Sequence, residues 1–158
     1  MTIHVLITAI PAQDITRPPG ILGILAGCCE AAGVGYDIFD LNLHMHQCLP
    51  EDICKQLTTD FLINEFRSVD NQLYYQQMCC DYLKLIQQTS PTHLAISVFT
   101  QASILAADFL LNYLKQNQID CKIIIGGLGV KNSVNQITGK QTFGEYCLSN
   151  NLIDYCVY

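Results

Sequence analysis

The chain has 158 residues, of which 50% are hydrophobic and only 14% are charged, and its formal net charge is −6. This length suits one domain with its own core, and the high apolar content suggests an exposed apolar face that a partner would cover. The eight Lys and Arg residues are scattered, so no nucleic-acid surface is expected. No apolar run approaches the roughly 18 residues of a membrane span, and the start lacks the features of a signal peptide. We therefore expect a cytoplasmic protein without a membrane partner.

The nine cysteines would suggest disulfides in a secreted protein. In a cytosolic domain, most of them are expected to be reduced and packed as small hydrophobic side chains. The chain contains no CxxC and no CxxxCxxC motif. It is therefore not expected to hold an iron–sulfur cluster or a zinc knuckle, or to carry out thioredoxin-type redox chemistry.

The first third of the chain has the pattern of a βαβ unit. Ile3 to Ile10 is an almost continuous apolar run, typical of a parallel strand that is buried on both faces. A loop over residues 11–19 leads into a helix predicted from Gly20 to Ala32, which Gly33 closes as a C-terminal cap. Gly35 to Leu41 is the second predicted strand. Strand, helix and strand within about 40 residues form a βαβ unit, and such crossovers are right-handed in nearly all proteins, so we expect a right-handed crossover.

The segment from Pro50 to Gln88 has no strand-like run, and its apolar residues recur at helical spacing. It is predicted to form two helices, at 50–66 and 70–89, as an insertion that contributes to a partner or substrate surface. The elements predicted after it are, in order, a strand (Thr92–Phe99), a helix (Gln101–Asn117), a strand (Cys121–Ile125), a helix (Thr142–Asn150) and a strand (Leu152–Tyr158).

This alternation of strands and helices predicts an α/β fold. The expected architecture is a flavodoxin-like (Rossmann-like) doubly wound sheet of five parallel strands in the order 2-1-3-4-5, with the two-helix insertion between strands 2 and 3. Residues 1–158 are expected to form a single domain.

Three strand ends should meet at one edge of this sheet, and ligands bind at that edge in open α/β folds. They supply the 11–20 loop, Ser97 with the residues after it, and the pair Gly126-Gly127. Two glycines after a buried strand leave room for a ligand or for another backbone. Each feature also has an ordinary structural explanation, which is a tight turn for the glycines and a core hydroxyl for Ser97.

Other site chemistries lack their motifs. Gly126-Gly127-Leu128-Gly129 does not spell G-x-G-x-x-G, no Walker lysine follows a glycine loop, and no G-x-S-x-G elbow is present. No aspartate ends the third predicted strand, as a response regulator would require. His44 and His46, with Cys48 nearby, would place two rings on one side of an extended segment. Without a further ligand the segment is interpreted as a solvated loop, and no metal site is predicted.

The stretch from Ile10 to Asn42 resembles the N-terminal cobalamin-binding-like domain of cobalamin-dependent radical S-adenosylmethionine proteins. The features that carry this resemblance, in order along the chain, are Pro18-Pro19-Gly20 opening the first helix, Asp40 and Asn42 after the second strand, Ser97-Val98-Phe99, Ile124-Ile125-Gly126-Gly127, and Tyr146 to Tyr158. The resemblance covers essentially the whole chain. It implies that residues 1–158 are an N-terminal fragment of a longer enzyme or a free-standing accessory domain.

The resemblance also implies which residues bind cobalamin. Ser97, Gly126 and Gly127 would line the slot for the nucleotide tail, and Phe99 replaces the usual leucine and would narrow it. Cobalamin domains that ligate cobalt through a histidine use D-x-H-x-x-G after the first strand. Here the equivalent loop contains Asp14, Thr16 and Gly20, and Thr16 stands in the place of the histidine. Corrinoid binding without a histidine lower ligand is therefore expected.

A radical S-adenosylmethionine barrel following this chain is the implied partner. The iron–sulfur cluster and S-adenosylmethionine would belong to that barrel, and cobalamin would be the methyl donor of a methyltransferase-like reaction. This chain alone is not expected to be catalytic, and an apolar face normally covered by the barrel would favour self-association. The alternatives are a cobalamin-like domain that binds no corrinoid and acts as a substrate-positioning or protein-interaction platform, and a stand-alone small-molecule enzyme.

Overall fold

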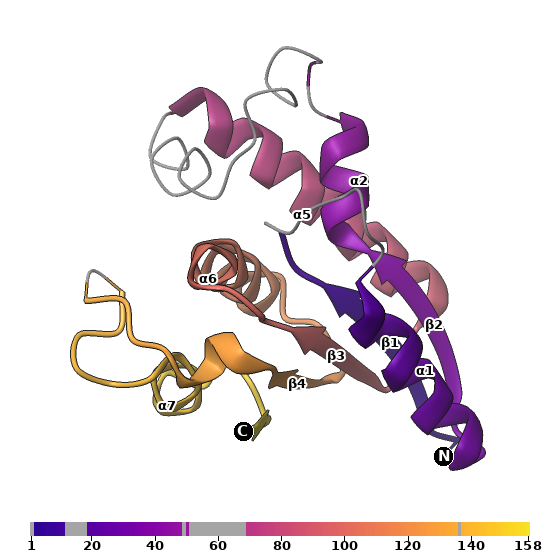
Figure 1. Cartoon of the computed structure of the whole chain (residues 1–158). Coiled ribbons are helices and arrows are strands. Elements are labelled where there is room, and N and C mark those ends of the chain that lie inside the picture. The colour runs from indigo at the N-terminus through magenta and orange to yellow at the C-terminus, as the bar shows by residue number, and fades with distance from the viewer. Residues whose placement is uncertain (1, 12–18, 49, 51–68, 136) are drawn as a thin grey trace.

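One parallel sheet organises the molecule (Figure 1). The computed structural model describes residues 2–11, 19–48, 50, 69–135 and 137–158. The strand order is β2-β1-β3-β4-β5, with every neighbouring pair parallel. The strands are β1 (His4–Ala9), β2 (Gly35–Asp40), β3 (His93–Ser97), β4 (Lys122–Gly126) and β5 (Tyr155–Val157). This order confirms the predicted flavodoxin-like fold.

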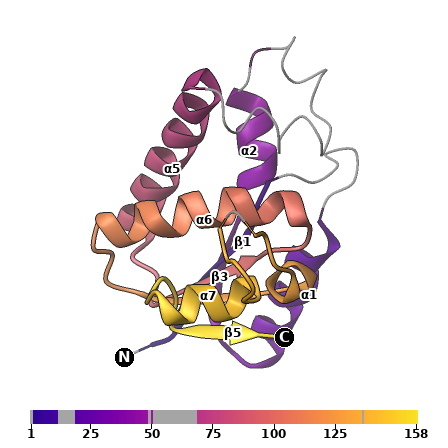
Figure 2. The ribbon, with the colours of Figure 1, turned by 90° about the vertical axis from the view of Figure 1, so that its left-hand side faces the viewer.

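Helices lie on both faces of the sheet (Figure 2). They are α1 (Gly20–Ala31), α2 (Leu41–Cys48), α5 (Val69–Thr89), α6 (Gln101–Gln116), the short 3-10 helix η1 (Leu128–Lys131) and α7 (Phe143–Ser149). Among the described helices, none has the length and apolar character needed to cross a membrane. The helix predicted at 70–89 is confirmed as α5, whereas the one predicted at 50–66 lies almost wholly outside the described residues.

The larger core fills one side of the sheet. Because side chains alternate along a strand, Leu6 of β1 and Ile10 just after it face this side and pack with α5, α6 and α7. The bulkiest side chains there, Tyr82, Leu110 and Phe143, are essentially inaccessible to solvent. Burial of such residues is worth about 1.5–3 kcal/mol each, so this side supplies most of the fold's stability.

The smaller core fills the opposite side. Ile7 and Ala9 of β1 pack there against Leu22 and Ala26 of α1. Ile124 of β4 is half-buried, and Tyr155 and Val157 of β5 are 54% and 59% exposed. Within the described residues α1 is the helix that joins this core, so the β4–β5 half of the same face remains open.

The segment after β2 differs from the prediction. Leu41 was expected to end the second strand, and the segment with His44, His46 and Cys48 to be a solvated loop, but Leu41–Cys48 form α2, which begins directly where β2 ends. The backbone N–H of Leu43 donates to the Asp40 carboxylate at 2.9 Å and so caps the helix. Leu41 and Met45, four residues apart, are both buried. The helix therefore forms because it has a cap and a buried face, although LNLHMH alternates like a strand.

A charged pair ties β4 to the turn before β5. Asp154 accepts hydrogen bonds from Lys122 Nζ at 2.7 Å and from the backbone N–H of Ile123 at 2.9 Å. Burial alone would raise the pKa of Asp154, but these two hydrogen bonds outweigh it and hold the pKa below its usual value. The ionised carboxylate therefore stabilises the folded state.

We expect Asp154→Asn to lower the free energy of unfolding by about 1 kcal/mol at pH 7, a value reduced for the partial exposure of the pair. Because the folded pKa is the lower one, this stability is present above the ordinary aspartate pKa of about 3.9 and is lost as the pH falls below it. Urea unfolding should therefore show a difference in unfolding free energy between wild type and variant at pH 7, and a smaller difference near pH 3. Asp120→Asn, at an exposed carboxylate, is the control, and an unchanged difference at both pH values would contradict this account.

Candidate functional site

A row of small residues crosses the carboxyl edge of the sheet. Ala9 pairs with Ser97, Ser97 with Gly126, and Gly126 with Val157. Residues in register on parallel strands point to the same face, and Ala9 faces α1, so the whole row lies on the α1 side. We call Ala9, Ser97 and Gly126 the small-residue row. It brings together two of the sequence-predicted site residues, Ser97 and Gly126.

The row ends at open space. Ala9 and Ser97 are 0% and 4% exposed, whereas Val157 beyond them is 59% exposed. A Cβ added to Gly126 would meet Val157 at 3.4 Å, which is ordinary van der Waals contact, and no other residue that the structure describes within 4 Å. The space above Gly126 is therefore not filled by the described part of the chain. A flat group could approach the sheet closely there.

Gly127 has a different role from its neighbour. Its φ of 107° and ψ of 175° belong to a region that only glycine adopts readily. A Cβ here would lie 2.6 Å from the backbone oxygen of Val98. The same oxygen accepts from the Gly129 N–H at 2.9 Å, so the loop after β4 is fixed against the end of β3. The tight-turn interpretation is correct for Gly127, which shapes the edge of the sheet through its backbone.

Of the remaining predicted site residues, the structure describes Phe99 and Gly20. Phe99 follows β3 and is 51% exposed, and Leu128 follows Gly127 and is 61% exposed, so each loop presents an apolar side chain. Gly20 is the first residue of α1, and a Cβ there would meet no described residue within 4 Å. Asp14 and Thr16 lie outside the described residues.

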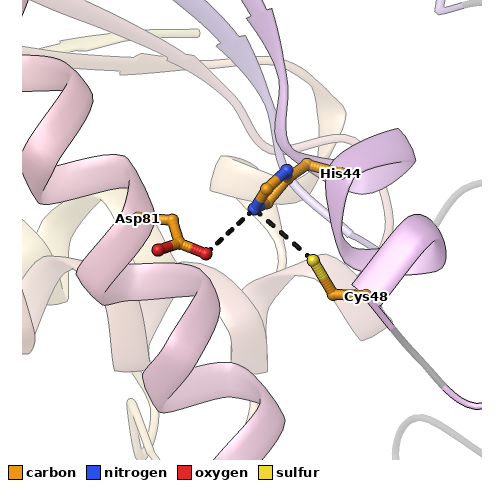
Figure 3. Close-up of side chains that lie close together, drawn as sticks. All are labelled: His44, Cys48 and Asp81. Atoms are coloured by element: carbon orange, nitrogen blue, oxygen red, sulfur yellow. Dashed lines mark hydrogen bonds and ion pairs between the residues drawn. The ribbon is translucent and has the colours of Figure 1, made fainter.

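A second cluster lies between α2 and α5 (Figure 3). His44 Nε2 is 3.3 Å from Asp81 Oδ2 and 3.7 Å from Cys48 Sγ. Hydrogen bonds from Lys84, His44 and Gln77 outweigh the effect of burial and hold the pKa of Asp81 below its usual value. The structure thus pairs His44 with Cys48 and Asp81 rather than with His46. The sequence signal was the four-residue spacing of His44 and Cys48, which brings two side chains together only on a helix.

The thiols of the described cysteines are all free. Burial raises the pKa of the Cys79 thiol to about 12 and that of Cys121 to about 11, so both are protonated at neutral pH. Cys79 and Cys147 are fully buried in the larger core. These thiols behave as the small hydrophobic side chains that the sequence predicts.

Several polar groups that line a groove at the opposite, amino-terminal edge of the sheet are already paired. Lys122 binds Asp154, Lys115 Nζ donates to the Asn150 carbonyl at 2.7 Å, and the Thr92 hydroxyl donates to the His4 carbonyl at 2.9 Å. These contacts join strands and loops of the scaffold. The carboxyl edge therefore carries the stronger candidate site.

The comparison with solved structures concerns the fold of the chain. The chain is similar to the crystal structure of a novel cobalamin-binding protein from Desulfitobacterium hafniense DCB-2, with a TM-score of 0.50 and 15% sequence identity. The shared feature is the fold. The alignment covers 98% of this chain and 52% of the other, so this chain spans about half the length of that protein. No family model matches the chain, and no curated protein sequence matches it.

Proposed function

We propose that this chain is a cobalamin-binding module whose small-residue row receives the nucleotide tail of the corrinoid. The observation that carries the proposal is the pairing of Ser97 with Gly126 beside open space on the α1 side of the sheet. The similarity of fold to a cobalamin-binding protein supports it. So does the resemblance of the sequence motifs around these same residues to cobalamin-binding-like domains.

The residues at this edge fit such a group. Gly126 leaves space that any larger side chain would occupy, and Gly127 holds the neighbouring loop against β3. Ser97 adds a buried hydroxyl between Ala9 and Gly126, and Phe99 adds an exposed ring just after β3. Bound cobalamin would supply a cobalt centre that can carry a methyl group. This chain's own residues would bind and orient the cofactor and exclude water from the tail.

We further propose that the module serves a radical S-adenosylmethionine enzyme of the methyltransferase type, and that it binds the corrinoid without a histidine lower ligand. The first part rests on the sequence resemblance, and the open β4–β5 half of the sheet supports a covering partner such as a barrel domain. The second part rests on Thr16, which occupies the histidine position of the D-x-H-x-x-G motif.

The exposed apolar side chains also favour a second candidate function. Tyr155 and Val157 on the open half-face, together with Phe99, would suit a protein-interaction or substrate-positioning platform that binds no corrinoid. The two candidates differ in one measurable property, which is affinity for cobalamin.

Titration of the purified protein with hydroxocobalamin tests the proposal. We expect a shifted visible spectrum and a measurable dissociation constant by calorimetry. An unchanged spectrum with no heat at high micromolar concentration would remove the cofactor-binding function and leave the platform. For bound cob(II)alamin, we expect an electron paramagnetic resonance spectrum without the splitting that a coordinated histidine nitrogen produces. The cofactor's own benzimidazole nitrogen can produce a similar splitting, so a splitting that changes when the protein's histidines carry nitrogen-15 would refute binding without a histidine ligand.

A further inference from the structure

The cluster between α2 and α5 has the composition of a metal site. His44 and Cys48 are one helical turn apart on α2, and Asp81 faces them from α5 (Figure 3). One ligand atom from each side chain, namely imidazole nitrogen, thiol sulfur and carboxylate oxygen, lies within 4.8 Å of the other two. We propose that these three residues bind a zinc-type divalent cation that joins α2 to α5.

Two of the three separations match the edges of a coordination tetrahedron. Zinc lies about 2.0–2.1 Å from nitrogen, about 2.0–2.2 Å from oxygen and about 2.3 Å from sulfur. Tetrahedral angles then place nitrogen about 3.4 Å from oxygen and about 3.6 Å from sulfur. The observed separations are 3.3 Å from His44 Nε2 to Asp81 Oδ2 and 3.7 Å from His44 Nε2 to Cys48 Sγ. The third separation, between Cys48 Sγ and the Asp81 carboxylate, is at most 4.8 Å, against about 3.6 Å in the tetrahedron. The exposed Cys48 at the last position of α2 can move to close this difference.

The geometry does not suit a catalytic thiol–imidazole–carboxylate triad. In a triad one imidazole nitrogen contacts the carboxylate and the other accepts the proton of the nucleophile. Here both contacts run to the same nitrogen, Nε2 of His44, as Figure 3 shows. One nitrogen cannot donate a proton to Asp81 and also remove one from Cys48. A cation placed between the three atoms would instead accept the nitrogen lone pair, the thiolate and the carboxylate together.

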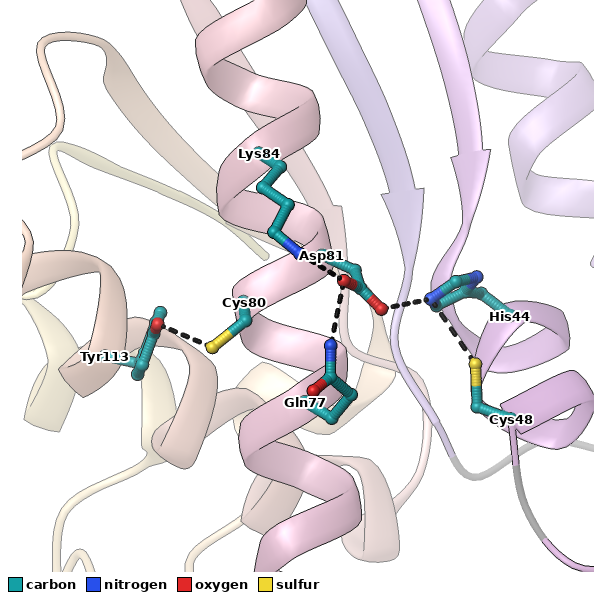
Figure 4. A network of polar contacts seen from close by, with 7 residues as sticks. All are labelled: His44, Cys48, Gln77, Cys80, Asp81, Lys84 and Tyr113. Carbon is teal, nitrogen blue, oxygen red and sulfur yellow. Dashed lines mark hydrogen bonds and ion pairs between the residues drawn. The ribbon is translucent and has the colours of Figure 1, made fainter.

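Neighbouring side chains hold the ligands in place (Figure 4). Gln77 Nε2 and Lys84 Nζ both donate to Asp81 Oδ1, at 3.0 and 3.1 Å, so the other oxygen, Oδ2, is the one presented to His44. The ring of Phe39 packs against the His44 imidazole with centroids 5.2 Å apart. Supporting contacts of this kind orient metal ligands and stabilise their geometry.

The donor set also selects the cation. Imidazole and thiolate ligands favour zinc and related transition metals over magnesium or calcium. One thiolate and one carboxylate balance a double positive charge. Three protein ligands leave a fourth position for water or another ligand. The expected structural effect is to fasten α2, which follows β2 without a loop, to the middle of α5.

Titration of the metal-free protein with Co²⁺ tests the proposal, because a cobalt–thiolate bond gives a near-ultraviolet charge-transfer band. We expect one equivalent of Co²⁺ to produce this band in wild type and Zn²⁺ to remove it. Cys48→Ser should abolish the band, and His44→Gln and Asp81→Asn should each weaken Co²⁺ binding at least about tenfold. Zn²⁺ should raise the melting temperature of wild type and leave that of Cys48→Ser unchanged.

Two variants serve as matched controls. Cys28→Ser removes another exposed thiol, and His46→Gln removes the other imidazole of α2. Both should keep the charge-transfer band, and circular dichroism should show that each variant is folded. Absence of the band in wild type, its survival in Cys48→Ser, or its loss in folded Cys28→Ser would overturn the proposal. Because Cys48 is exposed, its variant gives a clear answer even where a change at half-buried His44 disturbs packing.

Discussion

Gly126→Val is expected to lower the affinity for hydroxocobalamin at least about 100-fold, which corresponds to about 2.7 kcal/mol. The valine side chain would fill the space at the outer end of the small-residue row, next to Ser97. Its Cβ would make only ordinary contact with Val157, at 3.4 Å, and valine is favoured in strands. The fold should therefore persist while the slot closes. Spectral titration gives the affinity, and a thermal melt reports the fold.

Gly35→Val is the matched control for this experiment. Gly35 is also a strand glycine, but it begins β2 at the opposite edge of the sheet, and a Cβ there would meet only Ile3 O at 3.7 Å. Its affinity for cobalamin should equal that of wild type. Undiminished affinity in Gly126→Val would place the corrinoid elsewhere, and equal losses in both variants would point to a general effect on the domain.

The second large effect is expected at the neighbouring glycine, where Gly127→Ala should lower the free energy of unfolding by at least about 2 kcal/mol. The backbone conformation of Gly127 costs other residues about 1–3 kcal/mol, and overpacking adds about 1–3 kcal/mol. The overpacking arises because the new Cβ would lie 2.6 Å from Val98 O. That oxygen cannot move away easily, since Val98 is hydrogen-bonded both to Gly129 and to Gly126. Urea denaturation measures the loss.

Gly126→Ala is the control for stability, because it adds the same methyl group one residue earlier. We expect the unfolding free energy of Gly126→Ala to stay within about 1 kcal/mol of wild type. Alanine loses less conformational entropy on folding than glycine does, which offsets part of any cost of the added methyl group. Equal losses in the two alanine variants would refute the distinction between an open glycine and a turn glycine. Full stability of Gly127→Ala would contradict the backbone conformation itself.

Most elements of the fold could be predicted from local patterns. The apolar runs around Leu6, Leu94 and Ile124 are too short for helices and carry β-branched residues, so they indicate buried strands. The helical spacing of residues 70–89 and 101–117 was equally clear, and α5 and α6 are found there. The strand order then followed from the rule that alternating strands and helices build a doubly wound sheet. Element ends shifted by one to three residues, because caps and hydrogen bonds set them.

The sequence pattern did not predict helix α2. The alternation of LNLHMH imitates a strand, and the decisive contacts are the Asp40 cap and the burial of Leu41 and Met45. That error also concealed the cluster of His44, Cys48 and Asp81. Cys48 and Asp81 lie 33 residues apart in the sequence, and no sequence motif links them.

Amino-acid order alone was enough to indicate most of the elements, the doubly wound sheet and the strand ends where Ser97, Gly126 and Gly127 lie. These features depend on short-range periodicity and on glycine's conformational freedom. Only the tertiary structure distinguishes Gly126, which lies beside open space, from Gly127, which packs against Val98. Folding was also needed to align the small-residue row and to bring Asp81 to His44. Sheet register and helix packing join residues far apart in the chain, so these contacts exist only once the layers have assembled.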